Sequence, residues 1–491
     1  MLRAILSNSF FALVSDIAQR LPLAILLVLI ARELGEAGAG VFALGNNYLL
    51  ILSAIALWGL DQLLICEVAR DRCLSTIYLV HSLAIRLVMA SVLWLLLLGL
   101  LLEFRPYSLH TTRFIVMVVG VLVGDSVSNL MQSYFVAIER MWIPALVSVC
   151  TGISRLIIGA IAVSYSLEVL ALILILTSWI QAIVLTWLTR GYLSLVGFHF
   201  DMDFCRRQLS AGFPFVPIAL FIALENQLGG ILLSFSHSEA VVGYYGMANV
   251  IISALALLSQ ALRIGIFPTM ARLYRTECNH FVRLYERSWR YLSIVSLPMV
   301  LLVILLSDRI IHSIYGQAGS QATLTLQWLA PTLLFYFLNI PNARVMILDG
   351  RQRTLAKFFG ISTGANVLVC LLFIQLYGLQ AVAAARVVSM SILFAMNCAY
   401  VYRRILRVQP WHLVWRPLFA SSVMALVIFR MLPACSDIVR CLTGMGVYGI
   451  ALTFLRAIPS TEWAWLRQRL PFRNRCPVPG RPCTSSPRKS G

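Results

Sequence analysis

Charged residues are scarce in this chain, and lysine is nearly absent. Of 491 residues only 12% are Asp, Glu, Lys or Arg, while 60% are hydrophobic. So little polar side chain cannot cover the surface of a soluble globule of this length. Only Lys357 and Lys489 are lysines, so almost all of the net charge of +19 is carried by arginine. The composition therefore excludes an ordinary soluble protein and predicts a protein of the membrane.

Motifs for metal binding and for a disulfide framework are also missing. The 11 cysteines show no C-x-x-C pair and no Cys/His ligand spacing, so we expect neither a metal nor another cofactor. Cys435 and Cys441 lie close enough in sequence to pair, although two small hydrophobic residues are the simpler interpretation. Asp201 and Asp203 lack a phosphate-binding glycine loop, which favours a solvated acidic turn. Asp16 and Arg20 interrupt the first apolar stretch, so no cleavable signal peptide is expected.

Long apolar runs fill most of the chain. A membrane-spanning helix needs about 20 mainly apolar residues, and about fourteen windows meet this condition. The windows are 8–31, 41–60, 78–102, 114–136, 143–164, 168–189, 213–236, 241–267, 289–311, 326–347, 356–377, 379–402, 413–432 and 438–456. The segments 190–212 and 269–288 mix aromatic and basic residues, which predicts amphipathic helices at the membrane surface. The fold class is therefore an all-α polytopic membrane protein.

Arginines alternate between the connections of these helices. If the N-terminus is cytoplasmic, the even connections and the tail hold most of them, whereas 164–168, 236–241 and 376–380 hold none. The arginines of the even connections include Arg70, Arg72, Arg140, Arg206, Arg207, Arg272, Arg283, Arg287, Arg351, Arg403 and Arg404. This is the positive-inside pattern, so both termini are predicted to be cytoplasmic. The basic charge then reflects topology and attraction to anionic lipids, and no nucleic-acid partner is needed.

A short sequence occurs twice, once in each half. Glu36-Ala37-x-x-Gly40-x-Phe42 returns as Glu239-Ala240-x-x-Gly243-x-Tyr245. Internal repeats in polytopic membrane proteins are typical of transporters with a site between the repeats. We expect a domain organisation with two related lobes of six helices, two further helices and a tail. The boundaries are 1–190 for the N-lobe, 191–212 for an amphipathic connection, 213–402 for the C-lobe, 403–458 for the last two helices and 459–491 for a basic, proline-rich tail.

Several weak motifs in the same order resemble one known family. They are Ala31-Arg32-x-Leu34-Gly35, Gly59-Leu60-Asp61, Glu67-Val68-Ala69-Arg70-Asp71, Pro214-Phe215, Val242-Gly243-x-Tyr245, Phe267-Pro268, Leu348-Asp349-Gly350 and Tyr377-Gly378-Leu379. Together they are similar to bacterial polysaccharide-biosynthesis flippases of the multidrug/oligosaccharidyl-lipid/polysaccharide exporter superfamily. The resemblance implies two six-helix lobes around a cleft that opens alternately to each side. It also implies transport, for the export of exopolysaccharide or O-antigen-type glycans, of a polyprenyl-pyrophosphate-linked oligosaccharide to the periplasmic leaflet of a bacterial inner membrane.

One position departs from this resemblance. The family often carries an aspartate late in the seventh helix, where this chain has Leu228-Gly229-Gly230 and its nearest acid is Glu225. If that aspartate serves ion coupling or sugar contact in the family, it therefore remains open whether Glu225 has either role here.

Ionisable residues inside apolar helices mark the candidate site, because charge within the bilayer is costly unless it faces water or a partner. The cations are Arg20, Arg155, Arg263 and Arg386, and the acids are Asp16, Asp125 and Glu225. Arg86 and Arg344 lie near enough to a helix end for their guanidinium groups to reach the cytoplasmic face. Arginine suits a pyrophosphate because it stays protonated and binds in bidentate fashion. We expect the four arginines and Glu225 to bind substrate, and Asp16 and Asp125 to serve ion coupling or gating.

Each candidate also has a structural interpretation. Asp16 and Arg20 are spaced i,i+4 and would neutralise each other. Arg263 lies close to Pro268 and would reach the headgroups, whereas Glu225 begins a polar cluster. Arg155 stands alone in its helix. An alignment of Ile138-Glu139-Arg140 with Asp349-Gly350-Arg351 makes its position in the first half equivalent to that of Asn366 in the second.

Asp125 shares a helix face with Asn129, Gln132 and Ser133, a stripe that equally suits interhelical bonding or a cavity wall.

We therefore predict a flippase and not an enzyme, acting with membrane lipids and with a glycan polymerase or co-polymerase as possible partners. The first alternative is a cation-coupled multidrug exporter of the same superfamily. The second is a membrane glycosyltransferase or polymerase, against which the short loops argue.

Overall fold

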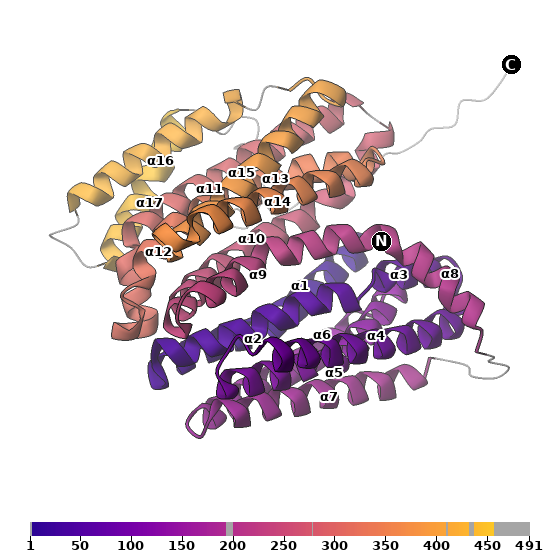
Figure 1. Ribbon diagram of the computed structural model, residues 1–491. Helices are drawn as coiled ribbons and strands as arrows, with labels where there is room; N and C mark the ends of the chain where they lie inside the picture. Colours follow the sequence, from indigo (N-terminus) through magenta and orange to yellow (C-terminus); the bar gives the residue numbers. More distant parts are fainter. Residues whose placement is uncertain (1, 193–199, 277, 409–410, 432–436, 456–491) are drawn as a thin grey trace, which may run out of the picture.

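The computed structural model describes residues 2–192, 200–276, 278–408, 411–431 and 437–455, and within them it contains helices and no strands. Two bundles lie side by side, with the N-terminal bundle below the C-terminal one in Figure 1. The N-lobe comprises α1 (Leu2–Glu33), α2 (Gly35–Ala56), α3 (Leu60–Arg70), α4 (Ser75–Phe104), α5 (Leu109–Ala137), α6 (Trp142–Val163) and α7 (Leu167–Arg190).

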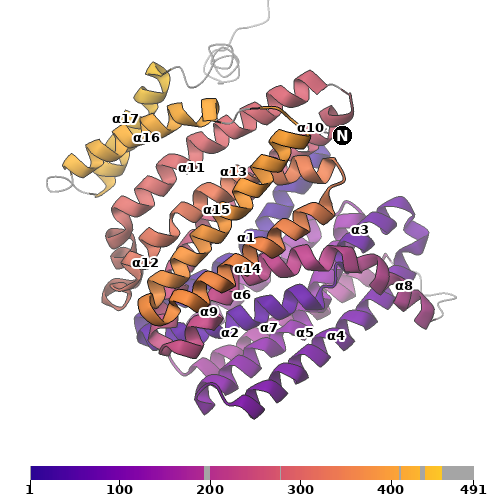
Figure 2. The same ribbon diagram turned by 45° about the horizontal axis from the view of Figure 1, so that its top comes forward.

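The second bundle follows a short connecting helix, α8 (Met202–Gly212). It comprises α9 (Val216–Ser236), α10 (Glu239–Thr276), α11 (Cys278–Tyr315), α12 (Ala322–Leu329), α13 (Pro331–Leu348), α14 (Gln352–Tyr377) and α15 (Leu379–Arg404). Two further helices, α16 (Trp411–Met431) and α17 (Asp437–Phe454), pack on the outside of this C-lobe against α11 (Figure 2).

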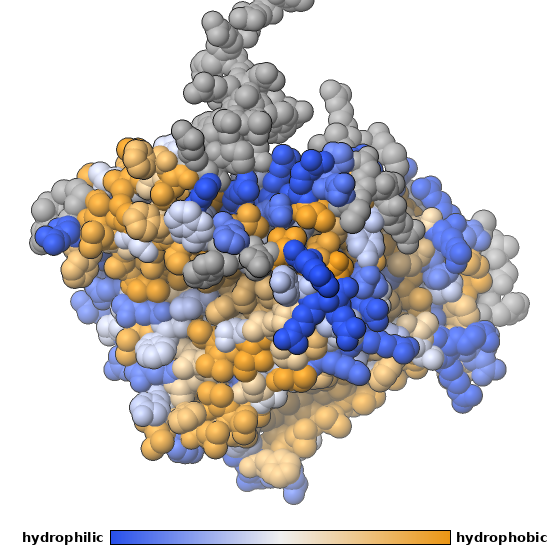
Figure 3. All heavy atoms as spheres, turned by 90° about the horizontal axis from the view of Figure 1, so that it is seen from above, coloured by the Kyte–Doolittle hydropathy of each residue, from blue (hydrophilic) through white to orange (hydrophobic). Residues whose placement is uncertain are grey.

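Thirteen of the described helical segments are long and apolar enough to cross a membrane, and the apolar part of the last helix, Leu442–Phe454, is shorter. The prediction of a polytopic all-helical protein is therefore confirmed. Long aliphatic side chains such as Leu96, Ile157, Leu176 and Leu372 are more than half exposed, which suits lipid contact and not water. Hydrophobic atoms cover large parts of the face drawn in Figure 3.

The two lobes meet where the repeated sequence lies. A Cβ added to Gly40 of α2 would fall 1.8 Å from the backbone oxygen of Glu239, and one added to Gly243 of α10 would fall 2.0 Å from that of Glu36. The contact is reciprocal, which is the signature of a two-fold relation. The repeat is therefore the crossing point of α2 and α10, and only glycine lets the two backbones approach so closely.

Several predicted boundaries were wrong. The segment 269–288 is no separate surface helix, because α10 runs on to Thr276 and α11 begins at Cys278. The window 326–347 falls within one candidate span, Ala322–Leu348, but this span is divided into α12 and α13 just before Pro331. The window 41–60 ends at a turn in which Trp58 and Gly59 have φ of 46° and 68°, and α3 follows. The predicted tail, 459–491, lies outside the described residues.

Candidate functional site

Arg155 of α6 lies within the N-lobe and is 6% exposed. Its Nη2 lies 3.3 Å from Oδ1 of Asp125 on α5, and its Nε donates to Oγ1 of Thr177 on α7 at 3.0 Å. Ser178 completes the cluster by donating to the same Asp125 oxygen at 2.6 Å. The expectation that Arg155 stands alone was wrong. Its partners come from neighbouring helices, which the spacing along α6 does not reveal.

The polar stripe on α5 is shared among several helices. Gln132 accepts a hydrogen bond from Gln19 of α1 at 3.0 Å, and Ser133 donates to Asp61 of α3 at 2.7 Å. Together with the Arg155–Asp125 pair, these contacts join α5 to α1, α3, α6 and α7. The stripe therefore bonds helices together, which was one of the two interpretations that its sequence allowed.

Arg86 of α4 is a buried cation that the sequence analysis misplaced. Its side chain is fully buried and pairs with Asp61 at 2.7 Å, and it also donates to the carbonyl oxygens of Leu57 and Ser126 at 3.3 Å each. The guanidinium thus points into the lobe and does not reach the protein surface. The sequence did contain one indication of this ion pair, because Asp61 follows the Gly59 turn and is an acid to which an inward-facing cation can bind.

Arg20 and Asp16 of α1 do not pair with each other. Arg20 is exposed, Asp16 is half-buried, and among the described residues neither forms an ion pair with the other. Arg20 lies one and two helical turns before Ala24 and Val28, so these three share a face of α1. That face is turned toward α10 and α11, because Ala24 and Val28 line a groove between these helices.

The groove is almost entirely apolar and has a volume of about 880 Å³. Most of its lining comes from α1, α10 and α11, and Met424 of α16 with Met445 and Tyr448 of α17 also line it. The two helices beyond the second lobe therefore contribute to one side of this apolar groove. Arg20 lies on the same face of α1 as Ala24 and Val28 but one turn nearer the N-terminus, so it follows directly beyond the residues that line the groove.

In the C-lobe, Glu225 of α9 is 1% exposed and is held by two other helices. It accepts hydrogen bonds from Asn366 at 3.3 Å, from Thr363 at 3.4 Å and from Ser362 at 3.5 Å, all on α14. Ser389 of α15 donates to the same carboxylate. The sequence analysis identified Glu225, but it did not find these four partners.

Arg386 of α15 is also 1% exposed and lies beside this cluster. It donates to Asn249 of α10 at 2.5 Å, to Asn226 of α9 at 2.6 Å, to Tyr336 of α13 at 2.8 Å and to Tyr245 of α10 at 3.4 Å. All four acceptors are neutral oxygens. The cation is therefore solvated by side chains of three helices and forms no direct ion pair within the described part of the chain.

Equivalent turns relate these positions in the two lobes. Glu139 and Gly350 have φ of 61° and 73°, and the following amides of Arg140 and Arg351 each donate at 2.9 Å, to Phe135 and Met346. Counted from these turns, Arg155 and Asn366 lie equally far along α6 and α14. The turns thus support the alignment of Arg155 with Asn366.

Two predicted features cannot be placed. The side chain of Arg263 on α10 lies outside the described side chains, as do Cys435 and the side chain of Cys441. Among the described residues, no group of three or more His, Cys, Asp or Glu side chains is arranged to hold a metal ion.

Solved structures of membrane transporters share this fold. The lipid II flippase MurJ in an inward closed conformation superposes with a TM-score of 0.74 at 16% identity, over 91% of this chain and 99% of that one. A mutant of the Vibrio cholerae MATE transporter VcmN gives 0.61 at 14% identity, over 84% and 98%. An inward-facing multidrug resistance MATE family transporter of the MOP superfamily gives 0.65 at 12%, over 80% and 98%.

The sequence matches a family model, and no curated protein matches it. The model of the family described as "Polysaccharide biosynthesis protein" matches residues 5–274, which is more than half of the chain. With its transporter fold and its membrane-spanning helices, this chain belongs to the polysaccharide biosynthesis protein family.

Proposed function

We propose that the protein is a flippase that moves a polyprenyl-pyrophosphate-linked oligosaccharide across the membrane by alternating access. The observation that carries this proposal is the apolar groove of about 880 Å³ that continues the face of Arg20. A lipid-linked glycan has a long hydrocarbon tail and an anionic headgroup. The groove suits the tail, and an exposed, unpaired arginine at its end suits the pyrophosphate.

The proposed headgroup path uses the ionisable residues of both lobes. Arg20 makes the first contact, because it is the exposed cation beside the groove. Arg155, Arg263, Arg386 and Glu225 are the further substrate contacts that we propose, while Asp16 and Asp125 would couple ions or gate the path. Arg155 and Arg386 are buried in the present conformation, so the substrate would reach them only after the lobes move.

The proposed setting is the inner membrane of a bacterium that exports a surface glycan of the exopolysaccharide or O-antigen type. Both termini would be cytoplasmic, and a glycan polymerase with its co-polymerase would receive the product. A reporter fused after Gly491 or after Arg287 should then be cytoplasmic, and one inserted near Ser238 should be periplasmic. Opposite labelling at any of these positions would contradict the topology.

A cation-coupled multidrug exporter is the second candidate, favoured by the buried carboxylate of Glu225. This group lies in a closed cluster of hydroxyl and amide donors, where a small cation could replace a proton. However, an exporter of organic cations has no evident use for an arginine beside the apolar groove, since like charges repel.

Arg20 offers the sharpest test, because it has no described partner whose loss would disturb the fold. Arg20→Ala should abolish surface-glycan production at matched protein level, and Arg20→Lys should restore part of it because charge is kept without bidentate geometry. Arg113→Ala, which removes an exposed arginine of α5, is the matched control and should leave production unchanged. Normal production by Arg20→Ala would contradict the role of the groove end.

Purified protein in vesicles separates the two candidates directly. A flippase should move a fluorescent polyprenyl-pyrophosphate glycan between leaflets and leave ethidium untouched. Export of ethidium driven by a sodium or proton gradient, without movement of the lipid-linked glycan, would favour the multidrug exporter.

The surface-glycan assay also tests Arg155, with one further control variant. Arg155→Ala should stay inserted but lose glycan export, and Arg155→Lys should recover part of it. Because Asp125 would be left without its cation, the pair Arg155→Gln with Asp125→Asn serves as a control for stability. Export by the neutral pair would remove Arg155 from the substrate path.

A further inference from the structure

A second cavity lies at the end of the C-lobe where α9 passes into α10. It has a volume of about 630 Å³, within the range of about 300–1,000 Å³ that is typical of small-molecule sites. The apolar groove between α1, α10 and α11 is lined by other residues, and none of the ionisable residues of the proposed headgroup path lines this second cavity. We call it the end pocket.

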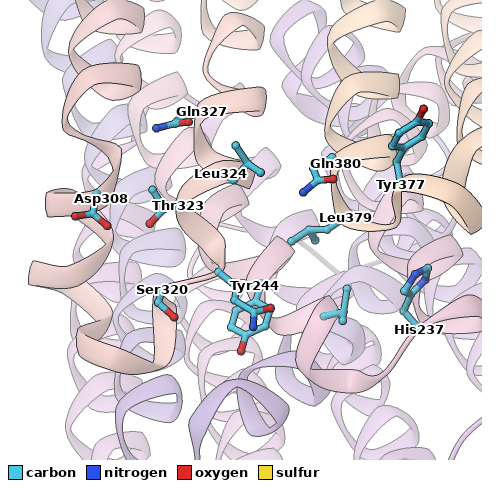
Figure 4. Close-up of a pocket in the computed structure, with 12 residues that line it drawn as sticks. His237, Tyr244, Asp308, Ser320, Thr323, Leu324, Gln327, Tyr377, Leu379 and Gln380 are labelled. Atoms are coloured by element: carbon cyan, nitrogen blue, oxygen red, sulfur yellow. The ribbon is translucent and has the colours of Figure 1, made fainter.

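Two walls face each other across the end pocket in Figure 4. One wall carries Asp308 of α11 together with Thr323 and Gln327 of α12. The opposite wall carries Gln380 of α15 and Tyr377 at the end of α14. Polar groups of several elements thus converge on one space, as they do in sites that orient a ligand by hydrogen bonds.

Two residues that line the end pocket each have a buried polar atom without a hydrogen-bond partner. These atoms are Nδ1 of His237, in the turn between α9 and α10, and Oγ1 of Thr323. Gln327 is half satisfied, because its Nε2 donates to Ser307 at 2.8 Å while its carbonyl oxygen has no described partner. Buried polar atoms without partners are rare and costly, and those of His237 and Thr323 both belong to side chains that line the end pocket.

The charge of the end pocket limits what it can hold. Asp308 is the only acid among the described residues that line it, and none of them is lysine or arginine. An anionic group would therefore meet an uncompensated carboxylate, and a divalent metal would find too few charged ligands. Three glutamine amides, the hydroxyls and one imidazole remain, and these groups both donate and accept.

We propose that the end pocket binds one uncharged sugar unit. Sugar hydroxyls donate to the Asp308 carboxylate and to the free oxygen of Gln327, and accept from the Gln380 amide and from His237. The ring of Tyr377 and the side chains of Leu324 and Leu379 offer apolar surface to the C–H face of the sugar. If the sugar belongs to the transported glycan, this pocket would hold it on the periplasmic side, and that assignment alone rests on the function proposed above.

Sugar binding can be measured without transport. Saturation-transfer NMR on the full chain in nanodiscs avoids detergents with sugar headgroups, and glucose, galactose and N-acetylglucosamine serve as probes. At least one should bind, and Asp308→Asn together with Gln380→Ala should weaken it by a factor of about five or more, as expected for lost hydrogen bonds. Glu103→Gln, at an exposed acid of α4, is the matched control and should bind like the original protein.

Each remaining outcome decides the proposal. No binding of any of the three sugars, or equal binding by the double variant and the control, would overturn it. Tight binding of tetraphenylphosphonium in their place would assign the end pocket to organic cations. Sugar binding in a protein that fails to move the lipid-linked glycan would keep this proposal and reject the function proposed above.

Discussion

The two lobes share a framework and differ in how they neutralise buried charge. Among the described N-lobe side chains, each buried arginine has a carboxylate: Arg155 pairs with Asp125, and Arg86 pairs with Asp61. In the C-lobe, Glu225 and Arg386 are both almost fully buried, and each is surrounded by neutral donors or acceptors. The duplication therefore fixes the helix positions and leaves the chemistry of each lobe free to change.

This difference has an energetic meaning. Removing one member of a direct ion pair leaves the other charge without compensation. Removing a cation that neutral oxygens surround leaves several buried oxygens without a hydrogen-bond donor. Asp125 keeps 30% of its side chain exposed, so water can replace Arg155 in part. No such exposure exists at Arg386. We therefore expect the C-lobe cluster to be the more sensitive of the two.

The largest effect is expected at the crossing that both lobes share. Gly40→Ala would place a methyl group against the Glu239 backbone, and Gly243→Ala would do the same at Glu36. Each substitution should lower the free energy of unfolding by about 3 kcal/mol, because two backbones must separate. Thermal unfolding in one detergent measures both variants.

Gly364→Ala on α14 is the control, because no atom lies within 4 Å of its added Cβ. Clearly unequal losses of stability from the Gly40 and Gly243 substitutions would contradict a two-fold relation between the lobes.

The next effect separates the two lobes. Arg386→Met should reduce stability by about 3–5 kcal/mol, because it strands buried oxygens and removes the charge beside Glu225. Arg155→Met should cost only about 1–2 kcal/mol, since Asp125 keeps its bond with Ser178 and its contact with water. Both are compared by SDS titration of the purified proteins. Equal losses would show that burial of the acid does not govern the difference.

A smaller effect measures the N-lobe pair itself. In a double-mutant cycle of Asp125→Asn and Arg155→Gln, we expect a coupling energy of about 1 kcal/mol, because one partner is partly exposed. The cycle uses the same titration. A coupling near zero would mean that Thr177 and Ser178, and not the opposite charge, hold the two side chains.

The smallest effect belongs to the connector between the lobes. Asp201 caps α8, and the hydrogen bond from the Asp203 amide, aided by Arg207, lowers the pKa of its carboxyl group. A lowered pKa means that this stabilisation is complete above the ordinary aspartate value and is lost as pH falls through the folded value. Amide exchange in α8 should therefore quicken at acidic pH, and Asp201→Asn should remove this dependence without affecting either lobe.

Sequence reasoning recovered the helices and the duplication because apolar length and repeated glycines are local signals. It also found Arg155, Glu225 and Arg386 as buried ionisable groups. It did not find their partners, since Asp125, Asn366 and Tyr336 come from helices whose relative rotation no spacing specifies. Arg86 shows the same limit: its position along α4 follows from the sequence, but the side of the helix on which it lies does not. The break at Pro331 was visible as a proline, yet an apolar window does not tell a kink from a continuous helix.

The glycine crossing lies near the first turns of α2 and α10, so most of each helix extends to one side of it. From Gly40 to its last residue, Ala56, α2 extends about 24 Å at about 1.5 Å per residue. A rotation of about 10° around the crossing would therefore shift the far end of this helix by about 4 Å, while the backbones at Gly40 and Gly243 hardly separate. A small rotation at the crossing would thus produce a much larger displacement at the far end of α2, and the position of the short repeated sequence would determine how far the helix ends move.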